Sequence, residues 1–256
     1  MKSLDESIVT ALDGSDPELL PYLPYILQDV WELGASPEVV MQLIRRHSQH
    51  PSSLRILDLG CGKGAVSVKI AAAFQCRCLG VDAFSPFIEE ARQKAREYGV
   101  EAHCRFECAD IRTGVWDENG FDWIILGSIG PVLGDYYDTL TALARYLRPQ
   151  GKIMMDDGYI EDHHSFSHPL IQKRSVILSQ IARAGMKLID EVIINKEVIK
   201  AADAFIFEKI ERRCRELMDR YPARRDLFLS YIRDQERENE VLETKIVGST
   251  MVISKV

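Results

Sequence analysis

The chain has 256 residues, of which 46% are hydrophobic, and its formal net charge is -7. This length and apolar content favour one substantial core with additions over two separate domains. The acidic balance argues against nucleic acid as the main partner, and the sequence has no run of about eighteen apolar residues that would predict a membrane span. The first residues also lack the apolar core of a signal peptide, so we expect a cytoplasmic protein.

Two helices are predicted before the first strand. The first spans about residues 17 to 33 and carries an apolar face that includes Tyr22 and Tyr25. The second begins with Ser36 as its N-cap and Pro37 at the first helical position, a common pair at a helix start.

A glycine-rich turn follows the first predicted strand, which covers residues 55 to 59. Gly60, Gly62 and Gly64 lack a Cβ, so the backbone can turn sharply there and approach a ligand closely. The turn fits the dinucleotide pattern G-x-G-x-x-[GA]. Asp58, two residues before it, would instead repel a pyrophosphate and suit a cation. The turn alone suits either a dinucleotide or an adenosyl compound, and Asp58 favours the adenosyl compound.

Acidic residues also end the next two predicted strands. Asp82 ends the second strand about twenty residues past the turn, which is the usual interval in a βαβ unit, and Ala83 and Phe84 follow it. The third strand, over residues 102 to 108, leads into Ala109-Asp110-Ile111. Three consecutive strands thus bring carboxylates to the same edge of a parallel sheet.

The fourth and fifth strands lead into segments of different character. Residues 121 to 126 form the fourth strand, and Gly127-Ser128-Ile129-Gly130 follows it. The fifth strand is entered through Leu147-Arg148-Pro149-Gln150-Gly151, and residues 154 to 168 are predicted as the loop after it. This loop holds four acidic residues and three histidines at the expected rim of the site, so it could supply a metal site or a general base.

A helical insertion is predicted at residues 195 to 240, between a sixth strand over 186 to 194 and a seventh over 242 to 256. The insertion contains arginine clusters, but it has eleven Lys or Arg and eleven Asp or Glu residues. Its net charge is therefore zero, which is typical of helix surfaces carrying salt bridges.

Taken in order, these motifs resemble the class I S-adenosylmethionine-dependent methyltransferases of the small-molecule type, within the methyltransferase-domain and ubiquinone-biosynthesis-like superfamily. The resemblance covers roughly residues 36 to 194 and the last strand. It implies an α/β fold with a Rossmann-like, seven-stranded, mostly parallel sheet and an antiparallel C-terminal strand. The expected segments are an N-terminal helical lid (1–50), a cofactor-binding core (51–194), a helical insertion (195–240) and the final strand (241–256).

The same resemblance implies S-adenosyl-L-methionine as the cofactor. In this family the acidic residue after the second strand holds the ribose hydroxyls, and the acidic residue after the third strand accepts from the adenine amino group. The implied cofactor-binding residues are Asp58, Gly60, Cys61, Gly62, Gly64, Asp82, Ala83, Phe84, Asp110, Ile111 and Gly127.

Candidate catalytic and substrate residues lie outside these motifs. Asp157, His163 and His164 are the candidates for a general base. The candidate substrate contacts are Tyr22, Tyr25, Ser128 and Tyr159, with plain packing as the alternative for the two N-terminal tyrosines.

We expect no metal ion and no cysteine-based site. Catechol-type O-methyltransferases hold magnesium with an Asp-Asn pair after the fifth strand and an Asp after the fourth. Asp156-Asp157 is similar to the pair, but Gly127-Ser128 supplies no carboxylate. Cys76, Cys78, Cys104 and Cys108, on or near the second and third strands, are predicted to be reduced and buried under helices, because zinc sites usually come from loops.

The expected activity is transfer of the sulfonium methyl group to a small molecule by in-line displacement. An Asn-Pro-Pro-aromatic turn, frequent in enzymes that methylate DNA bases or protein glutamine, is missing after the fourth strand. The helical insertion is expected to cap the active site or to form a homodimer interface. The alternatives are a non-catalytic protein that binds S-adenosylmethionine or S-adenosylhomocysteine, an NAD-dependent enzyme, and a tRNA-modifying enzyme.

Overall fold

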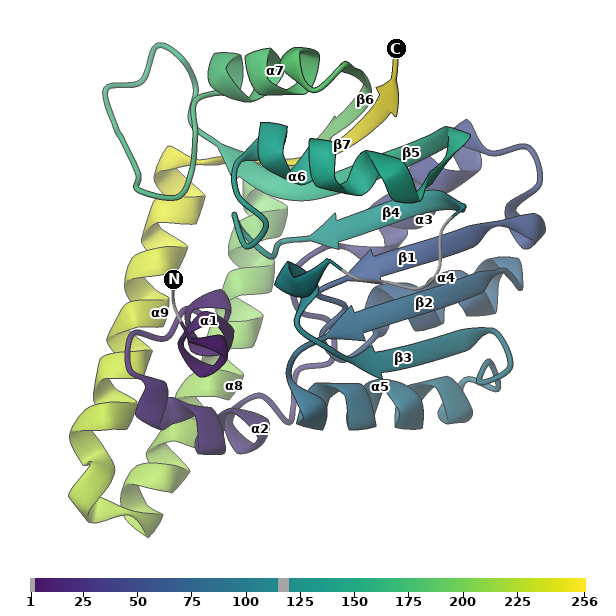
Figure 1. Cartoon of the computed structure of the whole chain (residues 1–256). Helices are drawn as coiled ribbons and strands as arrows, with labels where there is room; N and C mark the ends of the chain where they lie inside the picture. The colour runs from purple at the N-terminus through teal and green to yellow at the C-terminus, as the bar shows by residue number, and fades with distance from the viewer. Residues whose placement is uncertain (1–2, 115–119) are drawn as a thin grey trace. The chain divides into compact units, whose positions relative to one another are not determined.

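The computed structural model describes residues 3–114 and 120–256, which form two compact units (Figure 1). The sheet unit comprises Glu32–Ile193 and Ser249–Val256, and the helical unit comprises Met1–Trp31 and Ile194–Gly248. Across the described ranges, no helix is long and apolar enough to cross a membrane.

The sheet unit is built on seven strands in the order β3-β2-β1-β4-β5-β7-β6. The bounds are β1 (Arg55–Leu59), β2 (Arg77–Asp82), β3 (Cys104–Cys108), β4 (Phe121–Gly127), β5 (Leu147–Tyr159), β6 (Met186–Ile193) and β7 (Val247–Lys255). The pairs among β1 to β5 are parallel, whereas β6 and β7 pair antiparallel. The predicted fold class is therefore confirmed.

Burial explains why the central strands are almost continuously apolar. Four of the five residues of β1 and five of the seven residues of β4 are buried, as expected for parallel strands covered on both faces. The covering helices are α3 (Pro37–His47), α4 (Ala65–Phe74), α5 (Ser85–Glu97), α6 (Tyr136–Leu143) and α7 (Arg174–Arg183). In Figure 1, α6 lies in front of the strands and α3 lies behind them. The strands' carboxyl ends carry the turns that form the site.

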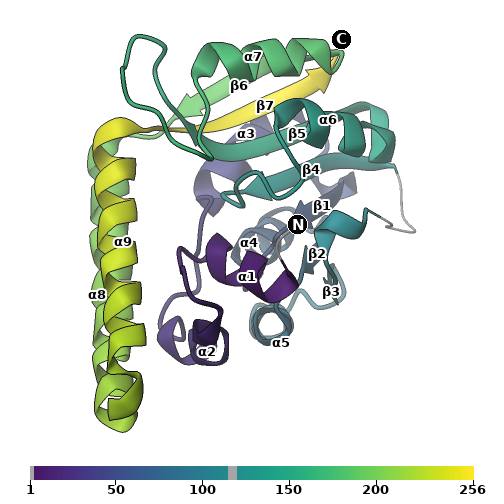
Figure 2. The same cartoon turned by 60° about the vertical axis from the view of Figure 1, so that its left-hand side comes forward.

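The helical unit combines the N-terminal segment with the insertion between β6 and β7. It contains α1 (Leu4–Ala11), a 3-10 helix (Pro17–Tyr22), α2 (Leu23–Ile26), α8 (Lys196–Arg220), a second 3-10 helix (Pro222–Arg224) and α9 (Arg225–Lys245). Helices α8 and α9 run side by side (Figure 2). Arg213 Nε donates to Asp29 at 2.6 Å, and the Tyr22 ring lies 5.0 Å from the Phe228 ring. Ion pairs and ring contacts thus hold the N-terminal segment to the helical pair.

Several predicted element bounds are wrong. The helix expected over residues 17 to 33 is a 3-10 helix followed by the four-residue α2, because Pro21 and Pro24 lack the N–H groups that a continuous α-helix needs. The third strand begins at Cys104 rather than at residue 102. The last strand starts at Val247 rather than near residue 242, because α9 continues to Lys245.

Two further differences concern the arrangement around the site. The fifth strand extends to Tyr159, so Asp156 and Asp157 lie on β5 rather than in a loop. Helix α3 belongs to the sheet unit by its contacts, whereas the sequence predicts residues 1 to 50 as one helical segment.

Candidate functional site

The glycine turn joins β1 to α4 and is closed on two sides. Gly60, Gly62 and Gly64 have φ angles of +68°, +52° and +74°, a left-handed conformation that favours glycine. A Cβ on Gly60 would lie 2.4 Å from Ile129 Cγ2, and one on Gly64 would lie 2.8 Å from Ala91 Cβ. No atom of the described residues lies within 4 Å of the corresponding position on Gly62. The turn is therefore packed at both ends and approachable at its centre.

Lys63, inside this turn, points toward the neighbouring helix α5. Its side chain is buried, and its Nζ lies 2.9 Å from Glu90 Oε2 on α5 and 5.4 Å from the centre of the Phe87 ring. The ammonium is thus committed to a carboxylate of the neighbouring helix. This arrangement removes the most obvious positive charge that could serve a pyrophosphate at the turn.

Asp82 ties the glycine turn to the end of β2. Gly62 N–H donates to Asp82 Oδ2 at 2.9 Å, and Phe84 N–H donates to Asp82 Oδ1 at 2.8 Å. Burial raises the pKa of this carboxyl above its usual range. A carboxylate offers about four lone-pair positions, so two backbone bonds leave acceptor capacity for a ligand hydroxyl. Ala83 is half-buried, and the buried Phe84 ring lies 4.8 Å from Phe87.

Asp58 has a different environment from the one that its motif implies. The side chain is 3% exposed and accepts a hydrogen bond from Ser67 Oγ at 2.7 Å, which fastens the first turn of α4 to β1. Burial raises its pKa to about 6. Cys61 is also buried, and a Cβ on Gly80 would lie 2.9 Å from its sulfur. These residues form the floor under the turn.

Asp110 and Ile111 follow β3. Asp110 accepts from Arg112 N–H and from Arg112 Nε, both at 2.9 Å, and this pairing holds the pKa of Asp110 below its usual range. Ile111 is buried beside it. The Asp110 carboxylate therefore stays ionised, but both of its oxygens already accept hydrogen bonds from the Arg112 guanidinium.

The end of β4 is held by β5 and β7. Ser128 has a φ of +56°, and its N–H and Oγ donate to Asp156 O and Asp156 Oδ1, both at 2.8 Å. Thr250 Oγ1 on β7 donates to Asp156 Oδ2 at 2.5 Å. A Cβ on Gly127 would lie 2.9 Å from Ala35 Cβ. The segment before α3 therefore runs against the carboxyl end of β4.

A cavity of about 140 Å³ lies beside the ends of β4 and β5. Its lining residues are Leu126, Ile129, Gly130, Pro131, Leu133, Gly134, Asp135, Tyr136, Thr139, Met155, Asp156, Asp157, Gly158, Pro169, Leu170 and Gln172. The Tyr136 side chain interacts with the Asp157 carboxyl, and burial raises the pKa of Asp157 to about 6. Asp157 is thus a half-buried carboxyl with a pKa suited to proton transfer near neutral pH.

The two candidate histidines lie apart from this cavity. His163 has a side chain that is 80% exposed, and its Nδ1 lies 3.3 Å from Glu161. His164 Nδ1 accepts from Phe166 N–H at 3.0 Å. Neither histidine is among the lining residues. The structure therefore brings only Asp157, of the three catalytic candidates, into the cavity.

The substrate candidates are divided between the two units. Ser128 lies at the end of β4, and Tyr159 is buried at the end of β5 with Arg174 over its ring. In the helical unit, Tyr22 packs on Phe228, and the Tyr25 hydroxyl donates to Glu216 at 2.6 Å. Both N-terminal tyrosines are thus engaged in contacts within their own unit.

The cysteines and carboxylates form no obvious metal centre. No group of three or more metal-ligating side chains was found among residues 3–114 and 120–256. All six cysteines are free, and Cys61, Cys76, Cys78 and Cys214 are buried. The predicted burial is wrong for Cys104, which is half-buried, and for Cys108, which is exposed, because both lie on the edge strand β3. Asp156, which resembles part of a magnesium-binding pair, already accepts from Ser128 and Thr250.

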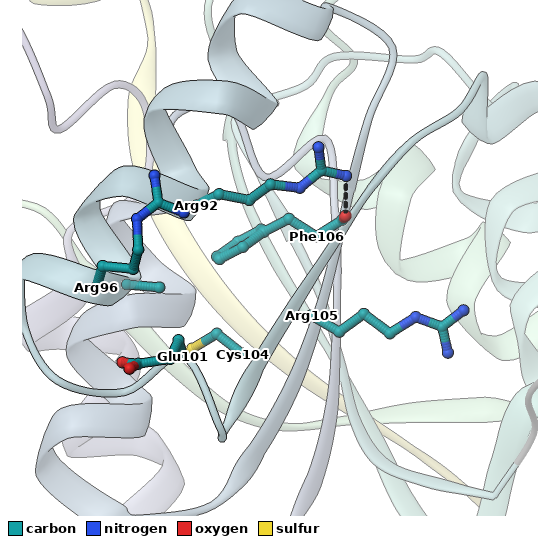
Figure 3. A pocket seen from close by; sticks show the side chains of 7 residues that line it. Arg92, Arg96, Glu101, Cys104, Arg105 and Phe106 are labelled. Atoms are coloured by element: carbon teal, nitrogen blue, oxygen red, sulfur yellow. Dashed lines mark hydrogen bonds between the residues drawn. The ribbon is translucent and has the colours of Figure 1, made fainter.

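A second cavity, of about 400 Å³, lies at the outer edge of the sheet (Figure 3). It is lined by Arg92, Arg96, Arg105, Glu101, Ala95, Cys104 and Phe106. Arg92 Nη2 donates to Phe106 O at 2.7 Å, and Figure 3 shows Arg105 pointing away from the other two arginines. These guanidinium groups do not converge, and the cavity contains none of the predicted site residues.

Sequence reasoning missed several residues that shape the site. Ile129 closes the turn over Gly60, and Tyr136 and Gln172 line the cavity. The position of Ile129 directly after β4 was a usable signal, because loops at strand carboxyl ends surround ligands in this topology. Gln172 lies in an irregular segment outside every recognised motif, so its contribution became visible only in three dimensions.

The sequence of this chain is similar to those of known methyltransferases. Residues 56–151 match a family model described as "Methyltransferase domain". The chain is 30% identical over 105 residues to the uncharacterized methyltransferase YcgJ of Bacillus subtilis, covering 41% of each chain. It is 27% identical over 103 residues to 27-O-demethylrifamycin SV methyltransferase of Amycolatopsis mediterranei, covering 40% of this chain and 38% of that protein. The chain thus spans about two fifths of the length of these relatives.

A solved structure extends the likeness to the whole fold. The S-adenosylmethionine-dependent methyltransferase from Thiobacillus denitrificans, solved with S-adenosyl-L-homocysteine, matches with a TM-score of 0.74 and 16% identity. The match covers 92% of this chain and 98% of that one. Residues 56–151 are thus similar to a methyltransferase domain, and the fold of the chain is that of the solved S-adenosylmethionine-dependent methyltransferase.

Proposed function

We propose that this chain binds S-adenosyl-L-methionine and transfers its methyl group to a small-molecule acceptor by in-line displacement. The observation that carries the proposal is the joined pair of the glycine turn and Asp82. Gly62 lies at the open centre of the turn, and its N–H orients the carboxylate that ends β2. Such an arrangement suits a nucleoside whose ribose hydroxyls donate to a carboxylate while its chain lies along the turn.

The residues at this edge fit an adenosyl group better than a dinucleotide. We assign the ribose to Asp82, the adenine to the surface formed by Ala83, Phe84 and Ile111, and its amino group to Asp110. Three strand ends present carboxylates, and Lys63 is paired with Glu90. Negative charge at this edge suits a sulfonium and an ammonium, and it opposes a pyrophosphate.

When bound, the sulfonium supplies an electrophilic methyl group and leaves as a neutral thioether. The chain's own task is then to align the acceptor, exclude water and receive any proton that the acceptor loses. Alignment alone can supply about 7 kcal/mol or more of the rate enhancement. We assign the proton to Asp157, because it is the one catalytic candidate that lines the cavity at the ends of β4 and β5.

A small molecule is the acceptor class that the chain favours. The net charge of -7 opposes nucleic acids, and the cavity of about 140 Å³ suits one small group. The Amycolatopsis relative is a 27-O-demethylrifamycin SV methyltransferase, and the substrate in that name is a small molecule. Residues 1–50 and 195–240 remain our candidates for a lid and a substrate cover, with a homodimer interface as the alternative for the insertion.

Isothermal titration calorimetry with S-adenosylhomocysteine tests the cofactor assignment. We expect binding by the wild-type chain and a loss of about a hundredfold or more in affinity for Asp82→Ala, because both the ribose contact and the orientation of the turn are removed. Asp122→Ala is a matched control: its carboxylate also accepts a backbone N–H, from Arg55 at 2.8 Å, but at the start of β4. If both variants bind like the wild type, the assignment of Asp82 is wrong.

Transfer of radiolabel from methyl-labelled S-adenosylmethionine to a panel of small alcohols, phenols, amines and thiols tests turnover. Transfer of label to any of these acceptors, if it is lost when Asp157 is substituted, supports a methyltransferase. Tight binding of S-adenosylhomocysteine without transfer to any acceptor would favour the non-catalytic binding protein.

A further inference from the structure

The cavity at the ends of β4 and β5 has an unusual balance of polar groups. Most of its lining is apolar, as in many small-molecule sites, with Leu126, Ile129, Met155 and Leu170 among the lining residues. Three lining residues carry carboxyl groups, and no basic side chain belongs to the set of described residues that line it. The cavity therefore presents negative charge without a counter-charge from its own walls.

The three carboxyl groups differ in how far they are already satisfied. Asp135 accepts from Asp138 N–H at 2.9 Å and from Gln180 Nε2 at 3.0 Å. Asp156 accepts on both oxygens, from Ser128 and Thr250. Asp157 accepts from Gly158 N–H at 2.8 Å, and the Tyr136 side chain interacts with the same carboxyl group. The bonds to Asp157 leave lone pairs within the cavity wall, so this carboxylate has capacity for one more donor.

Gln172 provides the second, independent observation. Its side-chain oxygen is buried and has no hydrogen-bond partner among residues 3–114 and 120–256, although the residue's backbone oxygen accepts from Ile160 N–H at 2.9 Å. Buried amide oxygens are nearly always paired, because leaving one unpaired costs its lost hydration. Since Gln172 lines the same cavity as Asp157, a ligand that brings N–H donors would satisfy both groups.

We propose that this cavity binds the protonated amine of an amine-bearing acceptor, with Asp157 supplying the opposite charge and Gln172 Oε1 accepting an N–H. This inference rests on the proposed methyl-transfer function and deepens it by naming the acceptor class. An ammonium group satisfies two acceptors at once and compensates the buried charge, whereas a hydroxyl group has one donor and no charge. A quaternary ammonium lacks the N–H that Gln172 requires. The apolar walls suit a short hydrocarbon chain attached to the amine.

The test compares two matched probes, n-butylammonium and n-butanol, titrated into protein saturated with S-adenosylhomocysteine and followed by ligand-detected NMR. We expect n-butylammonium to bind at least about tenfold more tightly than n-butanol, because only the cation compensates the carboxylate. Asp157→Asn should remove this preference and Gln172→Leu should diminish it, while Gln172→Glu should keep it. Asp162→Asn is the control, because this exposed carboxylate bonds Ser175 outside the cavity.

The outcomes separate this inference from the proposed function. Equal or tighter binding of n-butanol, or an undiminished preference in Gln172→Leu, overturns the amine assignment even if S-adenosylhomocysteine binds well. Failure of S-adenosylhomocysteine to bind overturns the proposed function, and the two probes can then still be compared on the protein alone. Where Gln172→Leu does not fold, as judged by circular dichroism, the comparison of Asp157→Asn with Asp162→Asn decides the question.

Discussion

At the scale of single residues, Asp157 should give the activity a characteristic pH dependence. A general base must be ionised to accept a proton, and burial raises the pKa of Asp157 to about 6. We therefore expect kcat to fall about tenfold per pH unit below pH 6 and to level off above pH 7. Asp157→Asn should lower kcat by about a hundredfold or more and flatten this profile.

Steady-state kinetics between pH 5 and pH 8 would show this, with Asp162→Asn as the control. Normal activity in Asp157→Asn, together with loss of activity in His163→Gln or His164→Gln, would move the base to the segment after β5.

A second residue-scale prediction concerns Asp13 in the helical unit. Burial, with Glu238 nearby, raises its pKa to about 7, and Gln235 Nε2 donates to it at 3.4 Å. Because the folded-state pKa lies above the unfolded value, the stability that this group contributes is full below about pH 4 and is lost as the pH rises through 7. Asn remains neutral and tolerates the positive φ of +59° at this position.

Asp13→Asn should therefore raise the free energy of unfolding more at pH 8 than at pH 4. Urea denaturation at the two pH values measures the difference. An equal change in the free energy of unfolding at both pH values would show that the pKa of Asp13 is not raised in the folded state.

At the scale of elements, the glycine turn should tolerate a methyl group at one position and reject it at another. A Cβ on Gly60 would meet Ile129 at 2.4 Å, whereas one on Gly62 would meet no described atom within 4 Å. Gly62→Ala should fold with a loss of about 1 to 2 kcal/mol from its left-handed backbone, but it should weaken S-adenosylhomocysteine binding, because the methyl group enters the ligand's path.

Gly60→Ala should be destabilised more strongly, and Ile129→Ala in the same chain should recover part of the loss. Thermal unfolding of the two single variants and the double variant checks this coupling. Equal destabilisation of Gly60→Ala and Gly62→Ala would contradict the packing described for the turn.

The same scale shows how far the sequence could predict this fold. The succession of the seven strands and the positive φ angles at Gly60, Gly62 and Gly64 follow from patterns that are local and repeated in chain order. The prediction of one helix over residues 17 to 33 was wrong, because it gave more weight to the long apolar stripe than to Pro21. Helix α1 was overlooked, although Ser3 and Glu6 form a capping box that is visible in the sequence.

The candidate site was less predictable than the fold, because it depends on contacts between distant segments. Asp157 was identified from composition, but its partner Tyr136 comes from the start of α6 and Gln172 comes from an irregular segment. Thr250 reaches Asp156 from the last strand, 94 positions away. No local pattern encodes such pairs, so they required the three-dimensional structure.

At the scale of the whole molecule, the chain leaves the sheet unit after β6 and returns with β7, and the helical unit lies between these strands in sequence. The N-terminal segment joins this unit through Asp29, which pairs with Arg212 and Arg213. The carboxyl-end edge of the sheet collects the glycine turn, three acidic strand ends and the small cavity. This concentration on one edge supports one adenosyl site with an acceptor site beside it.

Calorimetric titration of the full chain with S-adenosylhomocysteine and, separately, with NAD⁺ tests the central claim most directly. The arrangement of Asp58, Asp82 and Lys63 predicts one binding site for the adenosyl thioether and no measurable heat from the dinucleotide. Binding of NAD⁺ without binding of S-adenosylhomocysteine would contradict the account.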